Sequence, residues 1–162
     1  MNLGSILSES SGEPCAPEPV EFHFMRMTAQ GRERHRIKAI LLPVSSSDRA
    51  AARRDAQTYL RSLPEYAERE DPQGLGKVVP PIPAAVLDEE FLLKFLAYAL
   101  HQEDNALAKL VPGPDYPLLR AGLTIEQVVW LHKRYDKYIE AQYPEMVTAQ
   151  DMGELERQAA GK

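Results

Sequence analysis

The sequence has little cysteine and no long apolar run. Cys15 is the only cysteine among 162 residues, so an internal disulfide cannot form, as is typical of proteins in a reducing compartment. No apolar run approaches the roughly 18 residues that are needed to span a bilayer. The N-terminal segment lacks the basic and apolar regions of a secretory signal. We therefore expect a cytoplasmic protein without disulfides.

Motifs for metal, phosphate or nucleophilic chemistry are also absent. The four histidines are scattered, without HExxH or CxxC spacing, so no metal site is predicted. The segment GLGKVV, residues 74–79, lacks the spacing of a phosphate-binding loop. His132 and Asp136 are four residues apart and could share a hydrogen bond, but no Ser or Cys nucleophile stands in a strained turn. We predict no catalytic residues and no cofactor, and a site built on His132 and Asp136 is the enzymatic alternative.

Alternating apolar residues predict two strands near the N-terminus. Residues 1–19 are rich in Ser, Glu, Pro and Gly, so a flexible arm is expected there. In VEFHFMRM, residues 20–27, Val20, Phe22 and Phe24 alternate to give one apolar face, and RIKAILLPV follows after a turn at Gly31. An isolated hairpin is marginally stable, so we expect the next helix, over residues 46–63, to cover its apolar face. Residues 20–64 are assigned to this hairpin and helix.

The second half of the chain indicates a linker followed by helices. Residues 65–86 contain many prolines and are assigned to a Pro-rich linker, and residues 87–162 to a helical region. Asp88 is the expected N-cap of the first helix there. Thr124 and Gln127 have the spacing of a capping box for a second, and a short polar helix is expected from Thr148. The fold class predicted is α+β and mostly helical, with an N-terminal antiparallel β-hairpin packed by a helix and then a C-terminal helical bundle.

Positive charge is concentrated in one segment. Residues 26–61 contain nine Lys or Arg and three acids, a net charge of +6, which leaves −11 for the remainder of a chain whose total is −5. Such a patch could bind nucleic acid through phosphates, or an acidic protein surface, including one on another copy of this chain. The residues predicted to form the basic patch are Arg32, Arg34, Arg36, Arg49, Arg53 and Arg54.

Aromatic residues are concentrated in LTIEQVVWLHKRYDKYIEAQYP, residues 123–144. This stretch holds the only Trp and three of the seven Tyr. Trp and Tyr are enriched at protein interfaces because they combine a large apolar ring with a polar tip. Core packing is the expectation for Tyr135 and Tyr138, whereas an exposed Trp130 would anchor a protein contact.

Two longer stretches carry a resemblance to a known family. They are RMTAQGRERHRIKAILLPVSSSDRAAARRDAQTYL and EEFLLKFLAYALHQEDNALAKL, the latter followed by LLRAGLTIEQVVWLHKRYDKYIEAQYP. Together they make residues 20–145 resemble the tail assembly chaperones of long-tailed bacteriophages and related prophages, although the Pro-rich segment 72–83 departs from that pattern. The resemblance implies a non-enzymatic, often oligomeric protein that coats the helical tape measure protein before the tail tube polymerises around it.

These observations give a functional expectation. The partner is the tape measure protein or another tail component, held in the host cytoplasm by a groove between the third and fourth helices that takes an amphipathic helix. A homo-oligomer is also expected. The alternative is a small nucleic-acid-associated or structural virion protein that uses the Arg-rich segment 26–61. The residues predicted to contact the partner are Phe91, Phe95, Trp130, Leu131 and Tyr138.

Overall fold

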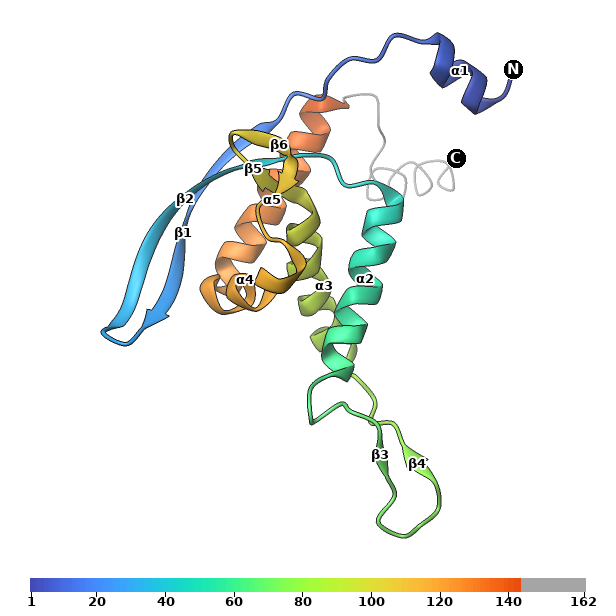
Figure 1. The fold of residues 1–162 in the computed structure, drawn as a ribbon, viewed down its shortest axis with the longest axis vertical. Coiled ribbons are helices and arrows are strands. Elements are labelled where there is room, and N and C mark those ends of the chain that lie inside the picture. The colour runs from blue at the N-terminus through green and yellow to red at the C-terminus, as the bar shows by residue number, and fades with distance from the viewer. Residues whose placement is uncertain (144–162) are drawn as a thin grey trace, which may run out of the picture. The chain divides into compact units, whose positions relative to one another are not determined.

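The computed structural model describes residues 1–143, in two compact units, Met1–Leu123 and Thr124–Lys162, the second described as far as residue 143 (Figure 1). All elements except the last belong to the first unit. In chain order they are α1 (Leu3–Glu9), β1 (Glu18–Thr28), β2 (Gly31–Leu41), α2 (Ser46–Arg61), β3 (Arg69–Glu70), β4 (Lys77–Val78), α3 (Ala84–Ala99), β5 (Leu100–Gln102), β6 (Asn105–Lys109), the 3-10 turn η1 (Gly113–Asp115), α4 (Tyr116–Gly122) and α5 (Ile125–Gln142).

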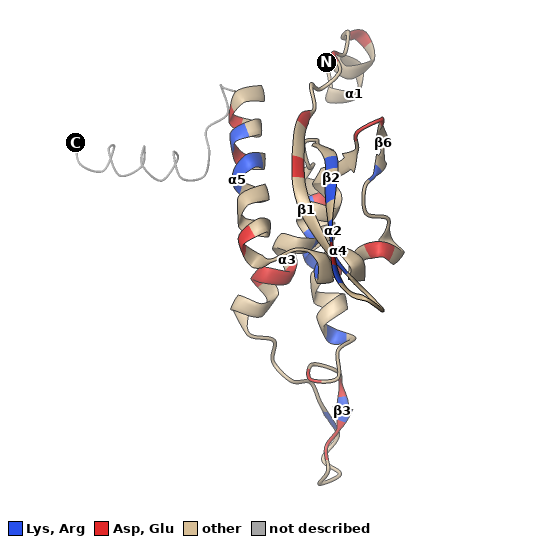
Figure 2. Ribbon diagram, turned by 90° about the vertical axis from the view of Figure 1, so that its left-hand side faces the viewer, with Lys and Arg blue, Asp and Glu red and all other residues tan. Residues whose placement is uncertain are grey.

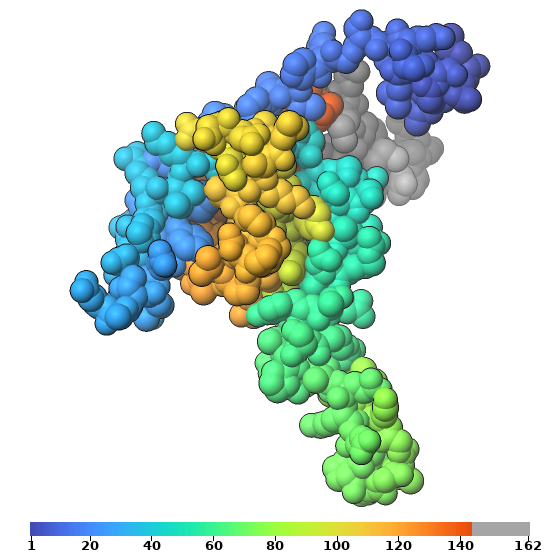
Figure 3. All heavy atoms as spheres, in the orientation of Figure 1, coloured from blue at the N-terminus to red at the C-terminus, as the bar shows by residue number. Residues whose placement is uncertain are grey.

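The larger sheet is antiparallel, with strand order β1-β2-β5-β6. β1 and β2 pair along their whole length, from Glu18 opposite Leu41 to Thr28 opposite Gly31. Gly31 has φ of 123°, a left-handed conformation that the turn requires and that glycine adopts without strain. Of the residues of β2, only Ala39–Leu41 pair with β5. The outer part of the β1–β2 hairpin is therefore a two-stranded ribbon, and its tip stands clear of the rest of this unit (Figure 3).

The expectation of a mostly helical fold ending in a helical bundle is wrong. The fold is α+β, but among residues 1–143 the helical share is about 47% and the strand share about 24%, in two antiparallel sheets. Residues 100–109, assigned from the sequence to the helical region, instead form the β5–β6 hairpin, which turns at Glu103 and Asp104. Leu100, the first residue after α3, already has the extended backbone angles φ −84° and ψ 127°. A three-residue strand is too short to show an alternating pattern.

The helix on the apolar face of the hairpin is α4, not the expected helix over residues 46–63. Gly122, the last residue of α4, lies so close to Phe24 of β1 that a Cβ atom at position 122 would be 2.2 Å from the ring. Phe22, two residues earlier on the same face of β1, is buried. The absence of a side chain at Gly122 therefore permits the close approach of helix and strand.

The helix that follows the hairpin, α2, packs along α3 instead. Its start was predicted near this position, and the structure places the N-cap at Ser45, whose hydroxyl accepts a hydrogen bond from the Asp48 N–H at 3.1 Å. Its buried face has small side chains at Ala52 and Ala56, which allow close contact, and ends in Leu60. α2 and α3 thus form a helical pair joined by the loop that carries the small β3–β4 hairpin.

The second unit is described through α5. Its N-terminus is the predicted capping box, since Thr124 accepts from the Gln127 N–H at 3.3 Å and the Gln127 side chain accepts from the Thr124 N–H at 2.9 Å. One stripe of α5 is buried: Val128, Leu131, Tyr135 and Tyr138. The short helix predicted from Thr148 lies outside the described residues. Within residues 1–143, no helix combines the length and apolar character required to cross a membrane.

We predict that Gly122→Ala lowers the free energy of unfolding by about 1–3 kcal/mol, because the added methyl group must displace the Phe24 ring. Chemical denaturation followed by circular dichroism measures this change. Gly113→Ala is the matched control, since a Cβ there meets no atom within 4 Å. A second change, Phe24→Leu, should recover part of the loss in the Gly122→Ala background. Equal stability of the two alanine variants would contradict the prediction.

Candidate protein-binding surfaces

An apolar cleft opens between the hairpin and the segment that ends in α4. Phe22 and Phe24 of β1 and Ile37 of β2 form one wall, because Phe22 lies directly opposite Ile37 in the register. The cleft has a volume of about 170 Å³. Leu118 is 55% exposed at its edge. The other lining residues are Leu110, Val111, Asp115 and Leu119. The cleft can accept a small number of apolar side chains.

The opposite face of the hairpin is basic. Successive side chains of a strand alternate between faces, so Arg32, Arg34, Arg36 and Lys38 share the face that Ile37 does not occupy. All four are exposed, and the basic residues are visible along β2 in Figure 2. Of the acidic residues of β1 and β2, Glu21 lies on this face, in an ion pair with Arg36. The facing β1 positions also include Met25 and Met27 opposite Arg34 and Arg32.

The three basic residues that were predicted on α2 have a different setting. The Arg53 guanidinium lies 4.6 Å from the centroid of the Phe91 ring, and that of Arg49 lies 5.3 Å from the centroid of Phe95. Both arginines, like Arg54, are exposed. Cation–π contacts of this kind are attractive and cover apolar surface. Arg49 and Arg53 therefore contribute to the packing of α2 on α3 as well as to surface charge.

The residues predicted to contact a partner differ widely in exposure. Phe95, Leu131 and Tyr138 are buried, at 2%, 0% and 3% exposure. Phe91 is half-buried beneath Arg53. Trp130 is 43% exposed. Of these five side chains, Trp130 is therefore the one that presents a large apolar surface to a second molecule.

The exposed surface around Trp130 is an apolar strip on α5. Ile125, Val129 and Trp130 are 47%, 40% and 43% exposed, and the first two are one helical turn apart. With Glu126 and Lys133 they line an open depression of about 350 Å³. The Arg134 guanidinium lies 5.7 Å from the Trp130 ring centroid, on the next turn of the helix. Sequence reasoning identified Trp130 but did not include Ile125 or Val129 in this surface.

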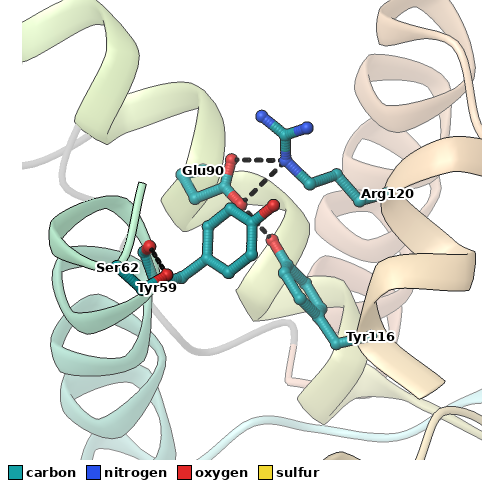
Figure 4. A network of polar contacts seen from close by, with 5 residues as sticks. All are labelled: Tyr59, Ser62, Glu90, Tyr116 and Arg120. Atoms are coloured by element: carbon teal, nitrogen blue, oxygen red, sulfur yellow. Dashed lines mark hydrogen bonds and ion pairs between the residues drawn. The ribbon is translucent and has the colours of Figure 1, made fainter. Parts of the chain in front are cut away.

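A buried polar network joins α3 to α4 (Figure 4). Glu90 of α3 is 3% exposed. Its carboxylate accepts a hydrogen bond from the Tyr116 hydroxyl at 2.7 Å and is bonded by Arg120 Nε at 3.2 Å from each oxygen. Burial, the largest cause, and the hydrogen bond to Glu90, the next, raise the pKa of Tyr116 far above its usual value. The carboxylate is thus satisfied by its own neighbours, as a buried charge requires.

Lysine and tyrosine side chains enclose this network. The Lys94 ammonium lies 3.4 Å from the centroid of the Tyr116 ring, and burial lowers the pKa of Lys94. Burial alone would lower the pKa of Arg120, but the carboxylate of Glu90 raises it overall. Sequence reasoning did not identify Glu90 as a buried residue. Its position three residues before Leu93 and seven before Ala97, in the apolar stripe of α3, is the signal that could have identified it.

A second polar contact links α2 to α3. The Tyr98 hydroxyl donates to the Asp55 carboxylate at 2.7 Å. This bond, with burial, raises the pKa of Tyr98 to about 12. The Glu90 network joins α3 to α4, and the Tyr98–Asp55 hydrogen bond joins α2 to α3, so both contacts have a structural role.

The enzymatic alternative from the sequence was a site built on His132 and Asp136. On α5, His132 is half-buried and Asp136 is exposed. Within the described chain, no three His, Cys, Asp or Glu side chains are grouped in a way that could hold a metal ion. Comparisons of the chain with models of protein families, with curated proteins and with solved structures found no match. The exposed surfaces of the hairpin and of α5 are the features of the described chain that bear on function.

We predict that Tyr116→Phe lowers the free energy of unfolding by about 1.5–3 kcal/mol, because the buried Glu90 carboxylate loses the hydrogen bond that the Tyr116 hydroxyl donates. Tyr59→Phe is the matched control. The Tyr59 ring packs edge-on against that of Tyr116 with centroids 5.5 Å apart, and this contact survives in both variants. Urea denaturation of the three proteins measures the difference. If Tyr59→Phe costs as much as Tyr116→Phe, the network is not what secures α4.

Proposed function

We propose that this protein is a non-enzymatic assembly chaperone or adaptor that binds an apolar helical segment of another protein. The observation that carries the proposal is the exposed strip Ile125, Val129 and Trp130 on α5. An apolar strip that a folded helix leaves on its surface is characteristic of a site for a protein partner.

The chemistry of the strip favours a helix as the bound segment. Val129 follows Ile125 by one turn, and Trp130 extends the strip to the side, so that the row suits the i, i+4 anchors of an amphipathic helix. The Arg134 guanidinium lies over the Trp130 ring. This cation–π contact restricts the Trp130 side chain before binding, and so reduces the conformational entropy lost on association. Glu126 and Lys133 place one charge of each sign at the edge of the depression. A partner helix with an apolar stripe and mixed charges on its flanks complements this surface.

The resemblance of residues 20–145 to tail assembly chaperones supports a tape measure protein as the partner. Such a protein is a very long helical chain that exposes apolar surface before the tail tube encloses it. A chaperone that covers part of this surface reduces aggregation. We place this action in the cytoplasm of the infected host cell, with release as the tube polymerises.

The expected effect of Trp130→Ala is a loss of partner binding without a loss of fold. Removal of a partly exposed Trp should weaken binding to a tape measure protein by about 30-fold, or about 2 kcal/mol. Isothermal titration with fragments of that protein measures the affinity, and circular dichroism checks the helix content. Lys137→Ala, an exposed change elsewhere on α5, is the control. Equal affinities for Trp130→Ala and Lys137→Ala would exclude this strip as the binding site.

A second candidate function is binding to nucleic acid through the hairpin. The supporting observation is the single face that carries Arg32, Arg34, Arg36 and Lys38. A two-stranded antiparallel ribbon fits the major groove of duplex DNA. Residues two apart on a strand are about 6.6–6.8 Å apart, so the four cations form a row along the ribbon. Phosphate contacts from such a row do not depend on base sequence.

For this second function, salt dependence is the decisive measurement. A fluorescent duplex titrated with the protein at several salt concentrations gives the slope of log affinity against log salt. Replacement of both Arg32 and Arg34 by Ala should reduce the magnitude of that slope by about 2, since each phosphate contact contributes about 0.9. Arg54→Ala, an exposed change on α2, should alter it less. Absence of duplex binding at 50 mM salt would remove nucleic acid as a candidate.

A further inference from the structure

The N-terminal helix has an apolar face with no partner of its own in the fold. No residue of α1 is buried, and its apolar side chains Leu3, Ile6 and Leu7 are 70%, 46% and 64% exposed. They are spaced i, i+3, i+4, so they form one face. Asn2 caps the helix by accepting from the Ser5 N–H at 2.9 Å. A helix of this length is marginally stable in water without tertiary packing. Packing of its apolar face against another apolar surface would stabilise it.

The cleft between the hairpin and α4 has the matching chemistry. Phe22, Phe24, Ile37 and Leu118 line it, and its volume is about 170 Å³. For scale, an engineered cavity of about 150 Å³ holds a benzene molecule. One or two aliphatic side chains of α1 therefore fit the space.

Charge also matches between the arm and the hairpin. Residues 1–19 contain Glu9, Glu13 and Glu18 and no Lys or Arg. Residues 19–41 of the hairpin carry five Lys or Arg and two Glu. Arg26, on the same face as Phe22 and Phe24, stands opposite Glu33, so most of the excess positive charge lies on the other face, where Arg36 also pairs with Glu21. Asp115, at the cleft, is acidic, but the side chains of α1 before Glu9 are all uncharged. The apolar helix can thus enter the cleft, while the acids that follow it are attracted by the net positive charge of the hairpin.

In the structure, α1 does not reach the cleft of its own chain: no residue of α1 is buried, and none lines that cleft. Residues 13–19 contain three prolines, which hold this stretch extended and continuous with β1. Gly12 then lies roughly 20 Å beyond the start of β1, and Phe24 lies roughly 20 Å along the strand in the other direction. From Gly12, α1 and its two linking residues reach back only roughly 17 Å. In Figure 1 the arm leaves β1 at the end opposite to the tip of the hairpin.

From these observations we propose that α1 of one copy binds in the cleft between the hairpin and α4 of a second copy. Leu3, Ile6 and Leu7 contact Phe22, Phe24 and Leu118 of the neighbour. Two copies that exchange arms reciprocally form a closed dimer, and each arm raises the effective concentration of the other. This contact involves neither the α5 strip nor a second protein species, so it is independent of the proposed function.

The test uses complementary variants of the full chain. Ile6→Asp places a charge in the arm, and Leu118→Asp places one at the cleft; sedimentation velocity of each should show association weakened by about tenfold or more. A mixture of the two variants restores one intact arm and one intact cleft, so it should form a heterodimer. Leu75→Asp, an equivalent change at a site 81% exposed on the loop between β3 and β4, is the control and should associate like the unaltered chain.

The outcomes separate the alternatives. Cys15, the only cysteine and exposed, takes a maleimide fluorophore, so the anisotropy of one labelled variant reports binding to the other. Restored association in the mixture supports arm exchange. Failure of the mixture to associate, with both single variants monomeric, would mean that α1 occupies its own cleft or that the cleft is unused, and would overturn the proposal. A monomeric unaltered chain at all concentrations would overturn it as well. None of these results depends on a tape measure protein.

Discussion

The position of α4 depends on one buried carboxylate. Glu90 is inside the protein, where an ion is stable only if hydrogen bonds and an opposite charge replace its water. Tyr116 and Arg120, at the start and within α4, supply both. A salt bridge in such a place contributes little net stability compared with apolar packing, but its bonds have defined directions. The network therefore determines where α4 lies on α3 more than how strongly it is held.

The placement of α4 in turn defines the surface of the hairpin. With α4 fixed on α3, its last residue meets Phe24, and the absence of a Cβ at Gly122 sets the distance between helix and strand. The same geometry covers Phe22 but leaves the neighbouring cleft open beside Leu118. A displacement of α4 would either close the cleft or expose the apolar face of β1. The ion pair between the buried Glu90 and the partly exposed Arg120 thus influences a surface feature with which it has no direct contact.

Sequence reasoning succeeded where a local pattern specifies the structure. The alternation at Val20, Phe22 and Phe24 predicted β1, and the Thr124–Gln127 capping box predicted the start of α5. It failed where tertiary contacts decide. β5 pairs with β2, which lies about sixty residues earlier in the chain, and its three residues are too few to show a period. The spacing of Glu90 from Leu93 and Ala97 was visible in the sequence, but its two partners come from a helix some thirty residues later, and no local rule identifies them.

For the candidate surfaces, the residue composition can be read from the sequence, but the face of the hairpin on which each residue lies is known only from the structure. The Arg-rich segment 26–61 was visible as a net charge, but strand register divides its hairpin part, placing Arg32, Arg34 and Arg36 on one face and the apolar cleft on the other. A single element therefore presents two unlike surfaces back to back. Apolar burial stabilises a contact at any salt concentration, whereas exposed charges mainly steer its formation and weaken as salt rises. A ribbon with both can attract an acidic segment through one face and retain its apolar residues at the other, which is the combination that a reversible assembly contact requires.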